Sequence, residues 1–210
     1  PSTLVGEKAR SDRTLVNLVS FGLFFRHVPE VKKIALFPLH LFLLPGERSE
    51  LHIFEDRYKE LVRHCISENE VFGIACNARE NWKNFGSLVR ISSVLKHYEQ
   101  GEMDVEIECV GLFRLKKFFY TVDDQLWPGG YVENWSNPLL NELDSFDTVL
   151  EPDAEEIDIY ELNLSLSDKL RFASITDTPS QSEFVNSRLR LQKLLVEQEE
   201  ACYNELIYLN

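Results

Sequence analysis

Residues 103–109 alternate strictly between apolar and acidic side chains, and no other pattern in the chain restricts the fold as much. A period of two belongs to a β-strand with one buried face, because a helix repeats about every 3.6 residues. The turn-forming pair Gln100-Gly101 before this segment predicts a hairpin, and Gly111 after it predicts a bulge or a sharp bend. Several short strands with one bend over residues 86–120 are typical of a partly closed, barrel-like sheet.

The part of the chain before residue 86 changes from strand to helix periodicity and back. Residues 34–39 and 71–76 are short apolar runs that predict strands. Pro38 restricts the first run to an edge or a bent strand, because proline cannot donate to a ladder. Between these runs, residues 55–69 carry an apolar stripe with helical spacing, which predicts a helix. The stripe consists of Tyr58, Leu61, Val62, Cys65 and Ile66.

The last part of the chain is first acidic and then helical. Residues 133–168 contain eleven Asp and Glu and no Lys or Arg, so like-charge repulsion predicts a mobile linker or a solvated face. Residues 165–210 have helical periodicity, and Ser180 with Glu183 fits a capping box. An isolated helix of this length is marginal in water, so we expect its apolar stripe to be buried. That stripe consists of Leu191, Leu194, Leu195, Cys202 and Leu206.

These patterns predict an α+β fold of four segments. An N-terminal extension of unknown role covers residues 1–33. A β-rich, partly closed, barrel-like subdomain with one embedded helix covers residues 34–136. An acidic connector covers residues 137–164, and a helical subdomain covers residues 165–210.

Charge, hydropathy and cysteine usage count against several classes of protein. The net charge of −13 disfavours a nucleic-acid partner, because binding to phosphates requires a basic surface. No apolar run approaches the roughly 18 residues of a membrane span. The cysteines are too far apart for a zinc ribbon or a redox pair, and they predict free thiols in a reducing, cytoplasmic environment. They are Cys65, Cys76, Cys109 and Cys202.

Motifs that carry known chemistry are absent from the sequence. It contains no GxxxxGK[ST] phosphate loop, no HExxH and no GxSxG. Cys65 and Cys109 lie on faces that we expect to be buried, where a thiol is inert. We therefore expect a protein that is not an enzyme and has no cofactor and no bound metal.

Three aromatic residues are the candidate binding residues. Trp82, Phe85 and Trp127 lie in segments that we expect to be loops and whose other residues are mostly polar. Large apolar side chains in loops often mark a surface for a partner. The alternative is that each side chain folds back as a lid over the sheet.

A resemblance to a known family rests on residues 36–58. The segments are Leu36-Phe37-Pro38-Leu39, Leu44-Pro45-Gly46 and Leu51-His52-Ile53-Phe54-Glu55-Asp56-Arg57-Tyr58. They resemble the start of the LON domain, the amino-terminal substrate-recognition domain of the ATP-dependent Lon proteases, although Asp56 stands where that family often has proline. The likeness continues through Phe72-Gly73-Ile74, Gly111 with Arg114, and Tyr131-Val132, and it covers roughly residues 34–210.

The resemblance implies a β-rich, PUA-like subdomain followed by a helical subdomain, and a function in binding protein. Our leading hypothesis is a non-catalytic module whose partners are unfolded or extended polypeptide segments, together with a protease or a chaperone. An enzyme of unrecognised type and a PUA-like nucleic-acid binder are the disfavoured alternatives. The net negative charge predicts a preference for basic and apolar segments.

We expect the purified chain neither to bind nor to hydrolyse ATP. The physical reason is that the sequence has no glycine-rich loop to hold the phosphates. Titration calorimetry checks this expectation, and saturable binding of ATP with micromolar affinity would contradict it.

Overall fold

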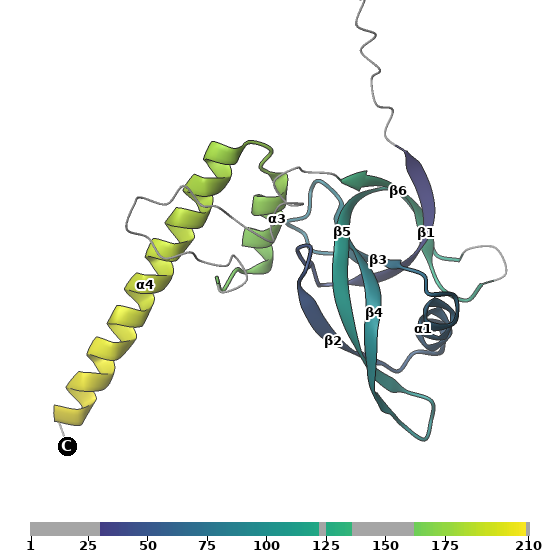
Figure 1. The fold of residues 1–210 in the computed structure, drawn as a ribbon, viewed down its shortest axis with the longest axis horizontal. Coiled ribbons are helices and arrows are strands. Elements are labelled where there is room, and N and C mark those ends of the chain that lie inside the picture. Colours follow the sequence, from purple (N-terminus) through teal and green to yellow (C-terminus); the bar gives the residue numbers. More distant parts are fainter. Residues whose placement is uncertain (1–29, 122–124, 136–161, 209–210) are drawn as a thin grey trace, which may run out of the picture.

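A computed structural model of the chain describes residues 30–121, 125–135 and 162–208, without the side chains of residues 200–208. Most of the expected extension and connector lies outside the described residues, although β1 already begins at Val31. The strands are β1 (Val31–Leu39), β2 (Arg48–Ile53), β3 (Phe72–Cys76), β4 (Phe85–His97), β5 (Met103–Phe119) and β6 (Gly129–Trp135). The helices are α1 (Asp56–Glu68), α3 (Leu166–Ser174) and α4 (Thr178–Tyr208). The α+β fold class, the helix expected at residues 55–69 and the helical C-terminal part are confirmed (Figure 1).

Strand β5 closes the sheet. The strand order is β2-β5-β4-β3-β1-β6, with an additional pairing between β5 and β6. The path from β5 through β4, β3, β1 and β6 therefore returns to β5 and forms a ring, and β2 lies outside this ring. The expected barrel-like sheet is confirmed (Figure 1).

A bulge at Val110 marks the point at which β5 exchanges one neighbouring strand for another. Val89 lies opposite Cys109, but Leu88 lies opposite Gly111, so Val110 is an extra residue on β5. Before the bulge, β5 pairs with β2 and β4, and after it β5 pairs with β4 and β6. The bulge or bend expected at Gly111 is therefore a bulge at the residue before it. The burial of every second residue from Met103 to Cys109 is confirmed.

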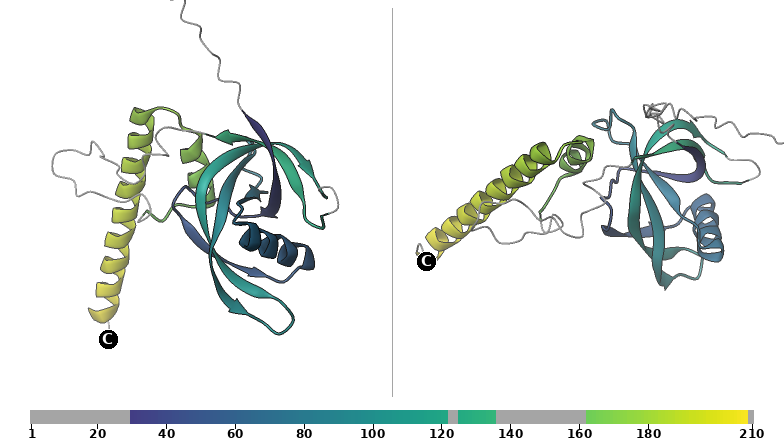
Figure 2. Two further views of the ribbon diagram at one scale, coloured as in Figure 1. Left: turned by 45° about the vertical axis from the view of Figure 1, so that its right-hand side comes forward. Right: turned by 45° about the horizontal axis from the view of Figure 1, so that its top comes forward.

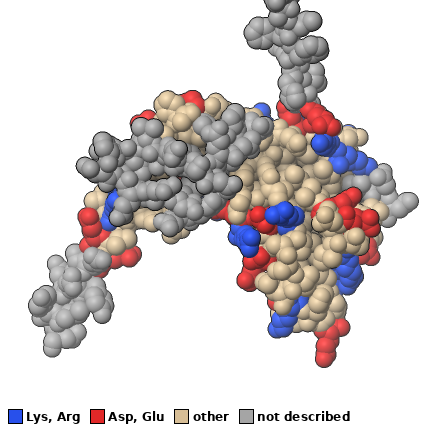
Figure 3. All heavy atoms as spheres, in the orientation of Figure 1, with Lys and Arg blue, Asp and Glu red and all other residues tan. Residues whose placement is uncertain are grey.

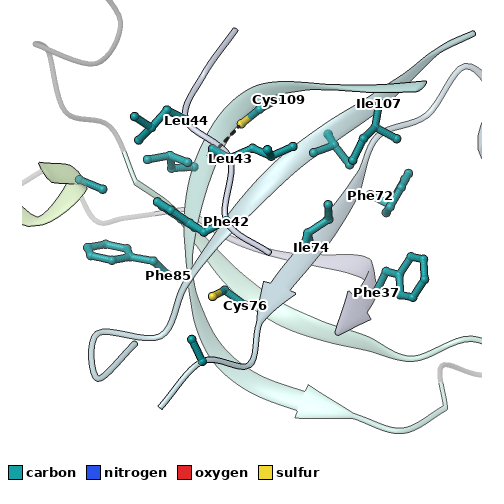
Figure 4. Packing of buried hydrophobic residues seen from close by; sticks show 14 of the residues in the cluster. Phe37, Phe42, Leu43, Leu44, Phe72, Ile74, Cys76, Phe85, Ile107 and Cys109 are labelled. Carbon is teal, nitrogen blue, oxygen red and sulfur yellow. Dashed lines mark hydrogen bonds between the residues drawn. The ribbon is translucent and has the colours of Figure 1, made fainter. Parts of the chain in front are cut away.

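The strands separate two apolar clusters. Leu36, Ala75, Phe113 and Val132 form the smaller cluster. Phe37 belongs to the larger cluster, and because consecutive residues of a strand point to opposite faces, the two clusters lie on opposite faces of β1. Helix α1 covers the face of the larger cluster, where Tyr58 stacks on Phe37 with ring centroids 3.8 Å apart. Figure 4 shows part of this larger cluster, with the Cys109 thiol directed at the Leu43 carbonyl oxygen.

Glycines on β3, β4 and β6 allow the smaller cluster to pack closely. A Cβ atom on Gly86 would overlap the Phe113 ring and lie 2.6 Å from the Ile74 carbonyl oxygen. A Cβ atom on Gly130 would lie 2.7 Å from a methyl group of Leu36. Side chains at these positions are therefore incompatible with the observed distance between the strands.

The caps of the two C-terminal helices differ from the expected capping box. The Asp177 carboxylate accepts a hydrogen bond from the Ser180 amide at 2.9 Å, so Asp177, and not Ser180, caps α4. Hydrogen bonds from the Ser180 hydroxyl and amide lower the pKa of Asp177. Helix α3 is capped by Ser165, whose hydroxyl accepts from the Asp168 amide at 3.2 Å. Asp and Ser are both strong capping residues, and spacing alone does not distinguish them.

The expectation that the apolar stripe of α4 is buried is wrong for the residues that the structure describes. Phe184 and Val185 are buried, but Leu191, Leu194 and Leu195 are about half exposed. The physical reason is that close packing is found at the first turns of α4, where Phe172 and Phe184 lie with ring centroids 5.8 Å apart. Farther along, Leu191 and Leu195 line an open pocket with Leu162 and Leu164. Beyond its first turns α4 extends away from the strands in every view (Figure 2).

We expect Gly86→Ala to destabilise the fold by about 1–3 kcal/mol, because the added methyl group overpacks the smaller cluster. Gly111→Ala is the matched control. A Cβ atom there meets no atom within 4 Å, so we expect a change within about 0.5 kcal/mol. Urea unfolding followed by circular dichroism measures both values, and equal midpoints for the two variants would contradict the packing argument.

Candidate functional site

The structure separates the three candidate aromatic residues. Trp82 is 78% exposed, whereas Phe85 is 2% exposed and Trp127 is 6% exposed. Phe85 packs near Phe42 and Trp135, with ring centroids at 6.4 and 5.1 Å. Trp127 folds back onto α1, where its ring lies 5.4 Å from that of His64. Phe85 and Trp127 therefore follow the alternative, in which the side chain folds back onto the protein, and Trp82 alone of the three is accessible to a partner.

Asn81 fixes the loop that carries Trp82. This loop covers residues 77–84, between β3 and β4. The buried Asn81 amide donates from Nδ2 to the carbonyl oxygens of Cys76 and Phe85, at 2.9 and 2.7 Å, and its Oδ1 accepts from the Phe85 amide at 2.8 Å. One side chain thus satisfies buried backbone groups at both ends of the loop. The backbone of the loop is therefore held in place, while the indole of Trp82 lies in solvent.

A pocket of about 250 Å³ lies between this loop and α3. Lys83 donates from Nζ to the Ser174 carbonyl oxygen at 3.3 Å, and Trp135 donates from Nε1 to the Ala173 carbonyl oxygen at 3.1 Å. These donors satisfy carbonyl groups at the C-terminal end of α3, where positive charge also complements the helix dipole. We call this surface the Trp82 pocket. Its lining includes Glu80, Trp82, Lys83, Phe85, Leu170 and Arg171.

The charges at the Trp82 pocket are opposite in sign to the net charge of the chain. The Lys83 ammonium lies 4.9 Å from the centroid of the Trp82 ring. The Arg171 guanidinium also lines the pocket, and the acidic side chain among the lining residues is that of Glu80. A cation over an indole face is an attractive arrangement that leaves the other face of the ring open to a partner.

The three thiols that the structure describes, those of Cys65, Cys76 and Cys109, are buried. Burial raises the pKa of Cys65 and of Cys109 to about 12. Both thiols are therefore protonated at neutral pH and, as expected from the sequence, inert. Within the described residues, no group of three or more His, Cys, Asp or Glu side chains is placed to hold a metal ion.

The sequence did not indicate the α3 side of the Trp82 pocket. Lys83 and Ser174 are 91 positions apart, and neither residue belongs to a motif. The available signal was local: a tryptophan in a polar loop, which indicated Trp82 but not its neighbours Leu170 and Arg171.

We expect Asn81→Ala to destabilise the fold by about 1–3 kcal/mol, because it leaves buried backbone groups at both ends of the loop without a partner. Trp82→Ala is the matched control in the same loop. Its side chain is mostly in solvent, so we expect a change within about 0.5 kcal/mol. Thermal unfolding measures both, and an Asn81→Ala variant as stable as the parent would show that the loop does not depend on this amide.

Comparisons with solved structures identify Lon N-terminal domains. The chain is similar to a Lon N-terminal domain protein from Xanthomonas campestris, with 27% identity over 79% of this chain and 98% of that chain and a TM-score of 0.49. It is also similar to the N-terminal domain of the Mycobacterium avium complex Lon protease, with 11% identity over 75% of this chain and 97% of that chain and a TM-score of 0.48. A comparison with curated proteins finds no match.

Two further findings bear on the class of protein. Among the described helices, none has both the length and the apolar character needed to cross a bilayer. The model of the ATP-dependent protease La (LON) substrate-binding domain matches residues 33–201. Because this match spans most of the chain, the chain belongs to the LON substrate-binding domain family.

Proposed function

We propose that this chain is a non-catalytic recognition module that binds extended or unfolded polypeptide segments at the Trp82 pocket. The observation that carries the proposal is the 78% exposure of Trp82 beside a pocket on a fixed loop. Covering an exposed tryptophan removes a large apolar area from water, and aromatic anchors of this kind contribute much of the energy at protein interfaces. Family membership supports the proposal, because the family model describes a substrate-binding domain.

The construction of the loop suits recognition of flexible clients. The three hydrogen bonds of Asn81 hold the loop before a client arrives. The protein therefore loses little conformational entropy on binding. The client loses its own entropy when it is ordered, so the affinity is weak even when the contact is good.

Local charge sets the preference for one class of segment. Lys83 and Arg171 line the pocket, and exposed charges farther away than about 8 Å are largely screened at physiological salt. The net charge of −13 therefore matters less at the pocket than the local charges, in which these two cations outnumber the single carboxylate of Glu80. The proposed clients combine aromatic or apolar side chains with carboxylates, in contrast to the basic segments that the net charge predicts.

The proposal assigns no chemical step to this chain. A protease or a chaperone would act on the bound segment, and this chain would supply recognition.

On the face shown in Figure 3, acidic and basic side chains of the described residues are interspersed over the strands. Interspersed charges of both signs do not favour the nucleic-acid alternative on this face. Between β4 and β5, Arg90 and Glu108 form an ion pair at 3.0 Å and neutralise one another.

We expect the parent chain to bind fluorescein-labelled peptides that contain aromatic and acidic residues, and Trp82→Ala to bind them about 10- to 30-fold more weakly. Lys83→Glu should weaken binding of acidic peptides more than of neutral ones. Tyr120→Ala is the matched control, because Tyr120 is an equally exposed aromatic residue that does not line the pocket. Fluorescence anisotropy measures each dissociation constant.

Two results would overturn the proposal. A folded Trp82→Ala variant with the affinity of the parent would exclude the Trp82 pocket as the binding site. A parent chain that binds no peptide of any composition would exclude polypeptide recognition itself.

A further inference from the structure

Helix α4 carries an exposed apolar surface away from the Trp82 pocket. Leu191, Leu194 and Leu195 are 46, 56 and 52% exposed, and we call these three residues the α4 patch. Successive residues of a helix turn by about 100°, so the three side chains lie within roughly one third of the circumference. Beyond α3, α4 extends away from the strands (Figures 1 and 2). Leu191 and Leu195 line a pocket of about 370 Å³ together with Leu162 and Leu164, and about half of each leucine side chain remains open to a partner. A continuous apolar stripe of this kind on a protruding helix indicates an interface.

Charged residues flank the α4 patch with opposite signs at its two ends. Arg190 precedes the patch and Glu197 follows it. The two residues are seven positions apart, which is close to two turns, so they lie on the same side of the helix, beside Leu194. Both are exposed, and within the part of the chain that the structure describes neither of them forms an ion pair.

This arrangement is complementary to itself in the antiparallel orientation. When two copies of α4 are related by a two-fold axis between residues 193 and 194, Arg190 of one copy lies level with Glu197 of the other, since both are the same distance from the axis. The same axis passes through the middle of the α4 patch. One register therefore matches the apolar contact and both ion pairs, as an isologous interface requires. A parallel pair would instead place Arg190 level with Arg190.

We propose that the α4 patch is a homodimer interface, in which α4 packs antiparallel on α4 of a second copy. Each copy covers the leucines of the other, and the symmetry forms the Arg190–Glu197 pair twice. A single helix pair buries less surface than a standard interface, so the dimer is weak, in the micromolar range. The inference is independent of the Trp82 pocket, because none of the residues that line that pocket belongs to α4.

Charge exchange tests the proposal and its orientation. We expect sedimentation equilibrium of the full chain to show a monomer–dimer equilibrium. Arg190→Glu and Glu197→Arg should each weaken the dimer roughly tenfold, because each places like charges together twice. The double variant R190E/E197R and an equimolar mixture of the two single variants should both recover the affinity of the parent, because opposite charges then meet again.

Controls separate this interface from folding and from client binding. Leu194→Glu should abolish the dimer while leaving the circular dichroism spectrum unchanged, and Trp82→Ala should dimerise like the parent. A parent chain that is monomeric throughout the micromolar range would overturn the proposal. So would a double variant and a mixture that stay as weak as the single variants, because the antiparallel register requires that both recover.

Discussion

The pairing of β5 with three different strands is the constraint on which the rest of the fold depends. Its 17 residues are too many for one straight ladder in a small ring, and the bulge at Val110 divides them into two ladders. The bulge also changes which residues face each cluster. Cys109 and Leu112 belong to the larger cluster, and Phe113 to the smaller one. Without the extra residue, the ladder after it would be displaced by one position and Phe113 would point to the wrong face.

The candidate site is a consequence of this closure. Phe113 fills the smaller cluster so tightly that β4 carries glycine at position 86. One residue earlier, Phe85 faces the larger cluster and its backbone is held by Asn81. The loop before β4 is therefore fixed at its end by the packing of the barrel. A rigid framework that positions a short exposed loop is a common basis for recognition.

The sequence predicted those parts of the fold that depend on periodicity. The alternation in residues 103–109 and the helical stripe in residues 55–69 were sufficient, because burial on one face directly determines each pattern. The positions of Phe85 and Trp127 could not be predicted in this way. Both have polar neighbours in the sequence, and their burial depends on distant partners, Trp135 and His64. The exposure of the α4 patch was missed although the periodicity is clear. An apolar stripe indicates which face of a helix favours contact, but it does not indicate whether the same chain supplies that contact.

The Trp82 pocket lies between the two structural halves of the described chain, the barrel of strands and the C-terminal helices. Lys83 of the barrel contacts the carbonyl end of α3, and Trp135, the last residue of β6, contacts it as well. A charged donor at this end of a helix is favoured by the helix dipole, so the contact is stronger than one between neutral groups. Asp177 caps α4 only three positions after Ser174, which restricts how α4 can leave α3. A client in the pocket would therefore touch both halves at the point where their relative position is held, and its binding energy would add to the energy that holds them together.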